Sequence, residues 1–230
     1  SKKEFSQDAT KFFHNLSGFS HKSKLQTLFA APMQIKSKIL ELIHNEAKKG
    51  NEGRIILKAN SIVDTDVILA LYQASNVGVK IDLIIRGICC LKPNIKGVSE
   101  NIRVISIVGK YLEHARIYYF KHSKPQIYFA SADLMPRNLE RRVELMTPIF
   151  QQDLADKLFG ILKIQSEDNA KSHELQSNGE YKKLSPNAGE KAINSQKILE
   201  DYTNSTYISL KREEEEVKAK KLSRQMFKKS

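Results

Sequence analysis

Two short stretches of the sequence hold the residue types that phosphoryl chemistry needs. The first, Tyr111–Phe120 (YLEHARIYYF), places one polar histidine, His114, in an otherwise β-prone, aromatic run. The second, Ser131–Asn138, is followed by Arg142, and together they supply a hydroxyl, a carboxylate, an amide and guanidinium groups. Histidine can move a proton near neutral pH, and arginine binds phosphate oxygens through a planar fork. These residues therefore indicate phosphate chemistry, provided that the fold brings them together.

Further polar groups follow the ends of predicted strands. Lys58, Asn60 and Ser61 end a strand that begins at Ile55, Arg86 follows the strand at 81–85, and Ser131 and Asp133 follow the strand at 126–130. In α/β sheets, ligands bind just beyond the carboxyl ends of the strands. The three groups converge only if their strands are neighbours, which their order along the chain favours.

Each of these candidates also has an ordinary structural explanation. A lone arginine after a strand, such as Arg86, is more often a surface ion-pair partner, and Lys58 is equally compatible with a solvated strand position. A histidine in a β run is more often a hydrogen-bonded core residue than a catalyst. The cluster of Ser131, Asp133, Arg137 and Asn138 is harder to explain away, because burying a polar loop without partners is costly.

The composition favours a globular protein with an anionic partner. The chain has 230 residues, 40% of them hydrophobic, and a formal net charge of +12, with a basic excess on both sides of residue 170. Such a field points to a nucleotide, polyphosphate, nucleic acid or an acidic membrane. The adjacent Cys89 and Cys90 match no metal-binding spacing, and we expect a reducing cytoplasm. No apolar run approaches a membrane span, and the first residues suggest a piece of a longer chain.

The pattern of apolar residues predicts an α/β fold. Helical spacing is expected at 6–16, 33–49 and 153–164, and a strand at 54–58, a helix capped by Asp64 and closed by Gly78, and a strand at 79–85 form a parallel βαβ unit. Further strands are predicted at 102–107, 116–120, 126–130 and 142–148. Residues 166–190 are expected to form a linker, and the tail from Ser195, with an acidic block at 213–216 and a basic block after it, a solvated helix.

Four colinear segments then resemble one known family. They are KANSIVD at 58–64, IDLIIRGICCL at 81–91, YLEHARIY at 111–118 and SADLMPRN at 131–138. Together they resemble the C-terminal portion of bacterial polyphosphate kinase, the long-chain enzyme with phospholipase-D-like domains. The resemblance implies the end of a first such domain at 1–20, a second at 32–165 with a mixed, largely parallel sheet flanked by helices, and a linker with a C-terminal helical extension at 166–230.

The resemblance also implies a function and its residues. The family transfers the terminal phosphate of ATP reversibly to inorganic polyphosphate, with Mg²⁺, through a phosphohistidine that would lie upstream of this chain. His114 matches the second essential histidine, and Arg86 and Arg142 match phosphate-binding arginines. Supporting roles are expected for Lys58, Asn60, Arg116, Ser131, Asp133, Arg137 and Asn138. The Mg²⁺ ligands are expected upstream, with no metal site in this chain.

The implied partners are ATP or ADP, inorganic polyphosphate, the N-terminal part of the same enzyme and further copies in a homo-oligomer. The implied location is the cytoplasm, and the second option is a peripheral position at the inner membrane. The chain by itself is expected to be inactive as an ATP:polyphosphate phosphotransferase, because it lacks the histidine that carries the phosphate.

One departure keeps other functions open. Phospholipase-D enzymes use a His-x-Lys motif, whereas this chain has His114-Ala115-Arg116, and an arginine keeps the charge of a lysine but not its geometry. Leu134 also stands where an aromatic residue is expected. The alternatives are a polyanion-binding module for polyphosphate or nucleic acid without its own catalysis, and a phospholipase-D-like phosphodiesterase.

Overall fold

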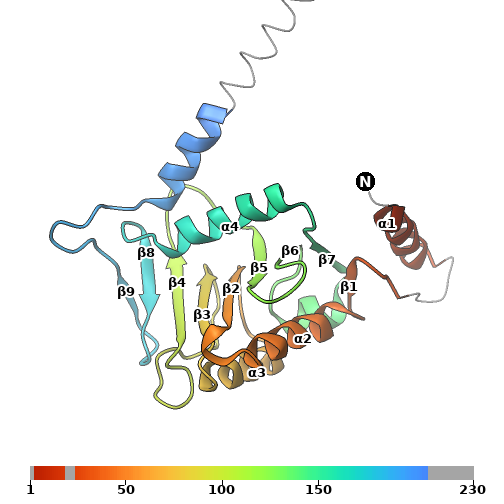
Figure 1. Ribbon diagram of the computed structural model, residues 1–230, viewed down its shortest axis with the longest axis horizontal. Coiled ribbons are helices and arrows are strands. Elements are labelled where there is room, and N and C mark those ends of the chain that lie inside the picture. Colours follow the sequence, from red (N-terminus) through yellow and green to blue (C-terminus); the bar gives the residue numbers. More distant parts are fainter. Residues whose placement is uncertain (1–2, 19–23, 207–230) are drawn as a thin grey trace, which may run out of the picture.

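The computed structural model describes residues 3–18 and 24–206, and their centre is one nine-stranded sheet (Figure 1). The strands lie in the order β1-β7-β6-β5-β2-β3-β4-β8-β9. Their bounds are β1 Phe29–Ala31, β2 Arg54–Ala59, β3 Lys80–Ile85, β4 Ile102–Ile107, β5 Arg116–Phe120, β6 Ile127–Ala130, β7 Glu144–Pro148, β8 Ser172–Leu175 and β9 Tyr181–Lys183.

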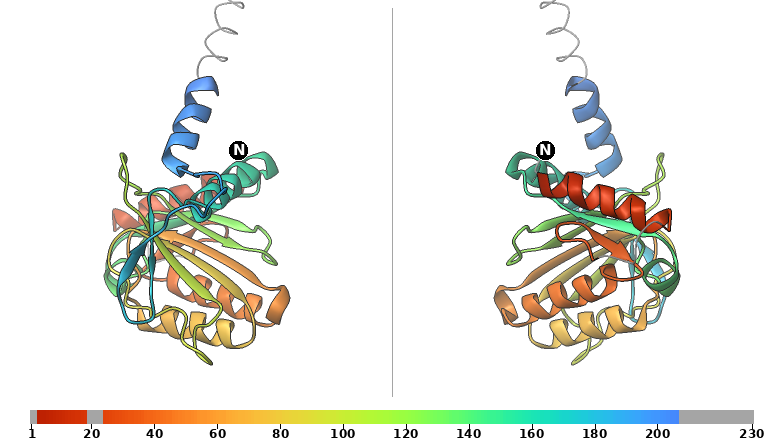
Figure 2. Two further views of the ribbon diagram at one scale, coloured as in Figure 1. Left: turned by 90° about the vertical axis from the view of Figure 1, so that its left-hand side faces the viewer. Right: turned by 90° about the vertical axis from the view of Figure 1, so that its right-hand side faces the viewer.

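Helices cover both faces of this sheet. They are α1 Lys3–Leu16, α2 Ile35–Ala47, α3 Thr65–Asn76 and α4 Gln152–Ser166, with short turns η1 Gly50–Glu52 and η2 Arg137–Arg141 and a helical stretch at 195–206. Helices α2 and α3 lie on one face and α4 on the other, while the helix at 195–206 projects beyond α4 (Figures 1 and 2). The predicted α/β class, with a mixed sheet flanked by helices, is confirmed.

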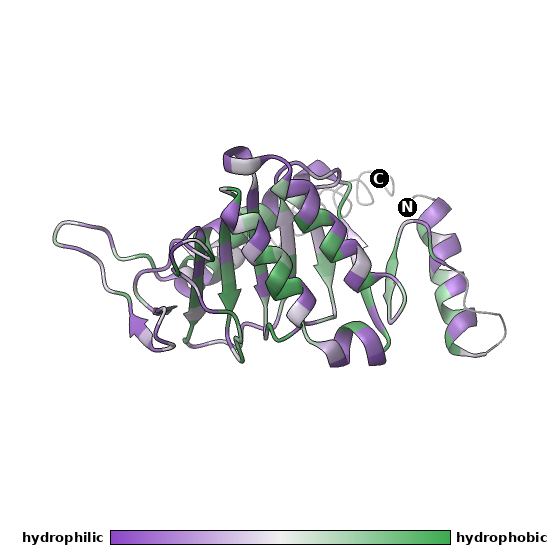
Figure 3. Ribbon diagram, turned by 90° about the horizontal axis from the view of Figure 1, so that it is seen from below, coloured by the Kyte–Doolittle hydropathy of each residue, from purple (hydrophilic) through white to green (hydrophobic). Residues whose placement is uncertain are grey.

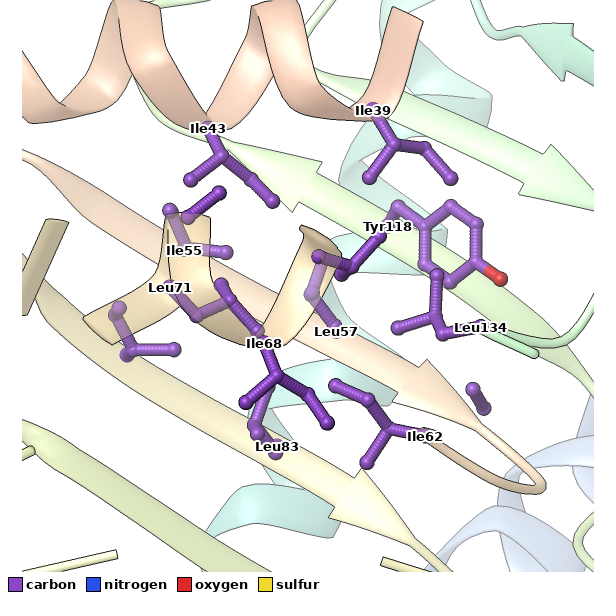
Figure 4. Close-up of a cluster of buried hydrophobic side chains, with 14 of the residues drawn as sticks. Ile39, Ile43, Ile55, Leu57, Ile62, Ile68, Leu71, Leu83, Tyr118 and Leu134 are labelled. Atoms are coloured by element: carbon purple, nitrogen blue, oxygen red, sulfur yellow. The ribbon is translucent and has the colours of Figure 1, made fainter. Parts of the chain in front are cut away.

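The two faces of β2 explain why its middle residues, Ile55, Ile56 and Leu57, are all apolar. Ile55 and Leu57 belong to a cluster with residues of α2 and α3, whereas Ile56 belongs to a second cluster with Leu162 of α4. Figure 4 shows Ile39 and Ile43 of α2 pointing toward the strand residues of the first cluster. Side chains alternate between the two faces along a strand, so where helices cover both faces of the sheet, consecutive side chains are all buried and can all be apolar. Burying each such side chain contributes about 1.5–3 kcal/mol.

The predicted βαβ unit is present with its predicted cap. Strand β2 pairs with β3 in parallel, and α3 connects them. The Asp64 carboxylate accepts a hydrogen bond of 3.1 Å from the backbone N–H of Val67, which satisfies one of the free donors in the first turn of α3. Gly78 follows the helix with a φ of +96°, a left-handed conformation that glycine adopts without strain.

The sheet differs from the prediction in its share of parallel strands. Parallel pairing is confined to β2–β3 and β3–β4, and all other neighbouring pairs are antiparallel. The expectation of a largely parallel sheet was therefore wrong, although the sheet is mixed as predicted. For β5 and β6 the reason is the short turn between them, because a turn of that length joins only antiparallel neighbours, whereas parallel strands need a long crossover.

The region expected to be a linker contains two strands. Strand β8 pairs with β4, and β9 pairs with β8, so 172–183 extends the same sheet. All three residues of β9 are exposed, and the central strands are the hydrophobic part of the sheet while β9 is hydrophilic (Figure 3). The loop prediction for 166–190 failed because polar composition marks a solvated outermost strand as readily as a linker. The short strand β1 was not predicted.

The N-terminal helix that was predicted is described in the structure, whereas the predicted C-terminal helix is described only as far as residue 206. At the N-terminal end, Asp8 of α1 is buried, and its carboxylate accepts hydrogen bonds from the backbone N–H groups of residues 26, 27 and 28. At the other end, residues 195–206 are helical as expected. The charged blocks predicted to continue that helix, at 213–216 and after, lie outside the described residues. Among the described helices none is long and apolar enough to span a bilayer.

We expect Gly78→Ala to lower the free energy of unfolding by about 1–3 kcal/mol, because alanine is strained at a φ of +96°. A Cβ atom there would also overlap the side chain of Asn51. Urea denaturation followed by circular dichroism measures the change.

Gly160→Ala is the matched control and should act in the opposite direction. Gly160 lies inside α4, and a Cβ atom there meets nothing within 4 Å. Alanine in place of glycine within a helix stabilises by about 0.5–1 kcal/mol. A stability for Gly78→Ala equal to that of the unsubstituted protein would contradict the conformational account.

Candidate functional site

Five strand ends meet on one side of the sheet, which we call the pocket side. It comprises the carboxyl ends of β2, β3 and β6 and the amino ends of β5 and β7. Lys58 near the end of β2 pairs with Ile117 near the start of β5, and Arg116 pairs with Ala130 at the end of β6. Because β5 and β7 run antiparallel to their neighbours, their first residues lie beside the last residues of β2 and β6. The strand ends that carry the predicted polar groups are thus neighbours.

A cavity of about 480 Å³ lies on the pocket side. It is lined by Asn60, Arg86, His114, Arg116, Ser131, Asp133, Arg137, Asn138, Arg142 and Glu144. Every residue predicted for the site except Lys58 lines this cavity, and Glu144 joins them. The loops that follow β2, β3 and β6 therefore converge, as the positions of their polar groups indicated.

The base of the cavity is a buried carboxylate, Asp133. Its oxygens accept hydrogen bonds from the backbone N–H of Asn60 (2.7 Å), the Asn60 amide (2.9 and 3.1 Å), and the Nε and Nη2 atoms of Arg116 (3.1 and 3.0 Å). Burial by itself raises the pKa of Asp133, but the hydrogen bonds from Arg116 and Asn60 outweigh it and hold the pKa below its usual value. Asp133 is therefore an ionised support that fixes Arg116 and Asn60.

Asn60 connects this support to Arg86. The Oδ1 atom of Asn60 accepts a hydrogen bond of 2.5 Å from Nε of Arg86. No described residue accepts a hydrogen bond from the two terminal nitrogens of Arg86, which lines the cavity and is partly buried. The guanidinium is thus held at one nitrogen and presents the others, an arrangement suited to two oxygens of one phosphate.

His114 lies in the loop just before β5, not within a strand, and its side chain is exposed. The reading of His114 as a core histidine is therefore wrong, since β5 begins only at Arg116. Nη1 of Arg116 lies 3.1 Å from Nδ1 of His114 and donates to the His114 carbonyl at 3.0 Å. A guanidinium can only donate, so Nη1 can hydrogen-bond to Nδ1 in the tautomer whose proton is on Nε2.

The opposite wall of the cavity comes from the segment between β6 and β7. Arg137 and Arg142 at the two ends of η2 are exposed, and no described carboxylate forms an ion pair with either. Glu144 accepts hydrogen bonds from Ser131 (2.5 Å) and from the Asn138 amide (2.7 Å). Ser131 and Asn138 therefore hold this segment in place and are occupied by Glu144.

Lys58 lies beneath the cavity, buried on the α4 face of β2, and does not line it. Its ammonium forms an ion pair of 2.9 Å with Glu113. Burial lowers the pKa of Lys58, and the positive charges of Arg86 and Arg116 add to this against the effect of Glu113. Burial raises the pKa of Glu113, but Lys58 and two amide donors outweigh it and keep that pKa low. Lys58 and Glu113 therefore form a charged pair under the site.

Sequence reasoning missed two site residues, Glu113 and Glu144. Glu113 lies inside a segment that carries the family resemblance, directly before His114, and Glu144 lies two residues after Arg142. A signal was present, because an acidic residue next to a predicted anion-binding residue needs a partner to neutralise it. Lys58 is 55 residues from Glu113 along the chain, whereas Ser131 and Asn138 precede Glu144 by 13 and 6 residues, and all three contacts become visible only in the fold.

The charge balance of the cavity suits an anion rather than a metal ion. Arg86, Arg137 and Arg142 have no acidic partner among the described residues, whereas the two carboxylates of the cavity are both occupied by donors. Magnesium prefers carboxylate and phosphate oxygens that are free to coordinate, and the described residues contain no group of three or more metal-ligating side chains. The cavity therefore does not fit a resident Mg²⁺ site and does fit phosphate.

We expect the difference in stability between the unsubstituted protein and Asp133→Asn to depend on pH. The folded-state pKa of Asp133 is lowered, so its charge stabilises the fold above the unfolded-state pKa of about 3.9, and that stabilisation is lost as pH falls through the lower, folded-state value. Urea unfolding should give a difference that is constant between pH 8 and 6 and shrinks below about pH 4. A difference that grows on acidification would contradict this ion pair.

The family comparison matches most of the chain. Residues 28–196 match the family described as "Polyphosphate kinase C-terminal domain 2". A polyphosphate kinase of Campylobacter jejuni is 55% identical over 228 residues, which is 99% of this chain and 32% of that protein. A polyphosphate kinase of Helicobacter pylori is 61% identical over 201 residues, 86% of this chain and 29% of that protein. The chain thus spans about a third of the length of these relatives.

A solved structure shares the fold. The crystal structure of polyphosphate kinase from Porphyromonas gingivalis superimposes with a TM-score of 0.84 at 35% sequence identity, covering 90% of this chain and 32% of that one. The fold of this chain is therefore similar to that of one portion of that larger protein.

Proposed function

Since this chain belongs to the polyphosphate kinase family, and specifically matches its C-terminal domain 2, we propose that it forms part of an ATP:polyphosphate phosphotransferase. In the proposed reaction the bond between the β- and γ-phosphates of ATP breaks, ADP leaves, and the phosphoryl group joins the end of a polyphosphate chain after passing through a histidine outside this chain. The reverse reaction forms ATP from ADP. This chain would supply the second histidine and the phosphate-binding arginines.

One observation carries the proposal: His114 and three arginines that have no acidic partner among the described residues line one cavity. The arginines are Arg86, Arg137 and Arg142. A phosphoryl group in transfer carries charge spread over its three outer oxygens, and enzymes stabilise it mainly by positioning and by fixed positive charge. A surface that gathers guanidinium groups while its own carboxylates stay occupied supports that role.

His114 and Arg86 would have different tasks. The proton on Nε2 of His114 would hydrogen-bond to, or pass to, a phosphate oxygen as the charge shifts during transfer. Arg86, held at Nε by Asn60, would bind two oxygens of the ATP phosphates with its terminal nitrogens. Arg142 would bind phosphate from the opposite wall, and Arg116 would act indirectly by orienting His114.

Magnesium, the remaining partners and the location stay proposals. The carboxylates of this cavity are occupied, so Mg²⁺ would arrive with ATP and take its protein ligands from outside this chain. The N-terminal part of the same enzyme, a homo-oligomeric assembly and a cytoplasmic or peripheral inner-membrane location are proposed from the family alone. The same holds for the domain bounds at 1–20, 32–165 and 166–230.

The cavity also supports one alternative, a polyanion-binding role without catalysis, because unpaired arginines bind any phosphate chain. The phosphodiesterase alternative is weaker. The charge that replaces the lysine of the His-x-Lys motif belongs to Arg116, whose fork is already used by Asp133 and His114. It is therefore not free to hold a diester.

The test is ATP-dependent synthesis by the full-length protein that contains this chain. With γ-labelled ATP and a short polyphosphate primer, label should appear in long polyphosphate, and with ADP and polyphosphate, ATP should form. This chain alone should bind polyphosphate with an affinity that falls as salt rises, and should retain no acid-labile phosphate. Polyphosphate binding without any transfer by the full-length protein would instead support the binding role.

A further inference from the structure

The helix at 195–206 is attached to the loop that carries His114. Gln196 on this helix makes two hydrogen bonds with the backbone of Tyr111: its Oε1 accepts from the N–H at 2.9 Å, and its Nε2 donates to the carbonyl at 2.8 Å. Nε2 also donates to Glu113 at 2.8 Å. One amide therefore satisfies the main chain three residues before His114 and the side chain directly before it.

Glu113 accepts hydrogen bonds from residues of three separate elements of the fold. Besides Gln196, its carboxylate accepts from Lys58 of β2 at 2.9 Å and from the Gln165 amide of α4 at 2.7 Å. Lys58 is buried and Glu113 is largely so. A charged group with this many partners in the protein interior has a fixed position. The residue next to His114 is thus immobilised from the sheet, from α4 and from the C-terminal helix.

The beginning of the C-terminal helix is itself anchored to the core. Asp168, which is completely buried, accepts hydrogen bonds from the Ser195 backbone N–H (2.8 Å) and from the Ser195 hydroxyl (2.7 Å). Its other oxygen accepts from the backbone N–H groups of residues 170–172, just before and at the start of β8. Gln196 therefore starts from a rigid attachment.

Much of the support of the loop comes from the C-terminal helix, where Glu200 also accepts hydrogen bonds from Lys110 (2.9 Å) and from the Tyr111 hydroxyl (2.8 Å). Within the described chain, residues 108–115 belong to no strand, and Val108, Tyr111 and Leu112 are exposed. Gly109 passes so close to the Gln196 amide that a Cβ atom there would lie 2.6 Å from Oε1. The loop and the helix are thus in direct contact at Gly109, Tyr111 and Glu113.

We propose that Gln196 and Glu113 are positioning residues for His114: they fix the loop so that Nε2 of the histidine faces the phosphate cavity. Neither residue lines that cavity, so both would act through His114. The C-terminal helix would thereby contribute to phosphoryl transfer without contacting the substrate. The activity readout of this proposal rests on the proposed function.

The decisive variant is Gln196→Leu in the full-length protein, since leucine keeps the volume but removes the hydrogen bonds. We expect kcat for polyphosphate synthesis to fall about tenfold to a hundredfold, because His114 would still be present but would no longer be held in the correct position relative to the phosphate. KM for ATP should stay within about twofold, because the arginines that bind ATP are unaffected. In a His114→Ala background, Gln196→Leu should have no further effect on kcat.

A second variant reaches the same contact from the opposite side. Gly109→Ala pushes the Gln196 amide away from Tyr111 and should reproduce the loss in kcat. Lys197→Ala is the matched control on the same helix: Lys197 forms only an exposed ion pair with Asp201, which contributes little. Its kcat should remain unchanged.

Nuclear magnetic resonance of the histidine rings separates this proposal from the proposed function. In protein labelled at histidine nitrogens and without substrate, Gln196→Leu and Gly109→Ala should move or broaden the His114 ring signals and leave those of His173 in β8 unchanged. If the protein makes no polyphosphate, the proposed function fails while these signals still decide the positioning role. Unchanged His114 signals, or an equal loss of kcat in the His114→Ala background, would overturn it.

Discussion

Replacing His114 with alanine is expected to lower kcat for ATP-dependent polyphosphate synthesis by about 10²–10⁴-fold, the range for loss of a positioned proton donor or acceptor. KM for ATP should change much less, because Arg86 and Arg142 remain on the walls of the cavity. The reason is geometric: His114 lines the cavity beside Arg116, and no other described histidine lines it. Steady-state kinetics of the full-length protein in both directions measures the change.

His114→Gln distinguishes the two tasks that this ring could have. The glutamine amide can place an N–H donor near the position of Nε2 but cannot transfer a proton. If hydrogen bonding suffices, the glutamine variant should retain much more activity than the alanine variant, whereas equal losses would identify proton transfer. His122→Ala is the control, because His122 contacts the Glu52 carbonyl at the opposite ends of the strands. Full activity of His114→Ala would refute the assignment of this residue.

Replacing Arg86 with methionine is expected to lower kcat/KM for ATP by about 10³-fold, at the lower end of what arginines at transferring phosphates contribute. Both parameters should suffer, since the guanidinium would bind ATP before and during transfer. Arg86→Lys should recover only part of the loss, because a lysine ammonium is a compact point charge without the planar fork that is held by Asn60 at one nitrogen and presents the other two to phosphate. The measurement is the initial rate over a range of ATP concentrations.

Arg141→Met is the matched control for Arg86. Arg141 is an exposed arginine near the cavity, in η2, but it does not line the cavity. Replacing Arg141 changes the net charge by the same amount as replacing Arg86. A similar loss of kcat/KM in the Arg141 variant would therefore show that Arg86 acts through the overall positive charge near the cavity. A loss confined to Arg86 would attribute it to the fork held by Asn60.

Local patterns predicted the elements that position the site. The βαβ unit was readable because Asp64, the apolar spacing of α3 and Gly78 all indicated the same helix. The convergence of polar groups was also predictable in part, because β2 and β3 are joined by one crossover and must be neighbours. Arg86 and Asn60 could therefore be placed together from the sequence.

The remaining arrangement depends on contacts between distant segments. No short stretch of the sequence shows that β5 pairs with β2 or that β8 pairs with β4, because each pairing joins two segments that are far apart along the chain. The same holds for Glu113, whose partners are separated from it by 52 to 83 residues along the chain. The core reading of His114, weighed as the ordinary alternative to a site histidine, was wrong for a related reason: the β-prone run at 111–120 begins before the strand, which starts only at Arg116.

The outermost strand β9 has a consequence for the protein in solution. An unpaired strand at the side of a sheet offers backbone donors and acceptors to any other extended chain, and lysines there oppose such addition. Lys182 and Lys183 occupy two of the three positions of β9, and all three are exposed. Their charges thus oppose the addition of a further strand on this side of the sheet, and neither lysine lines the cavity that holds His114.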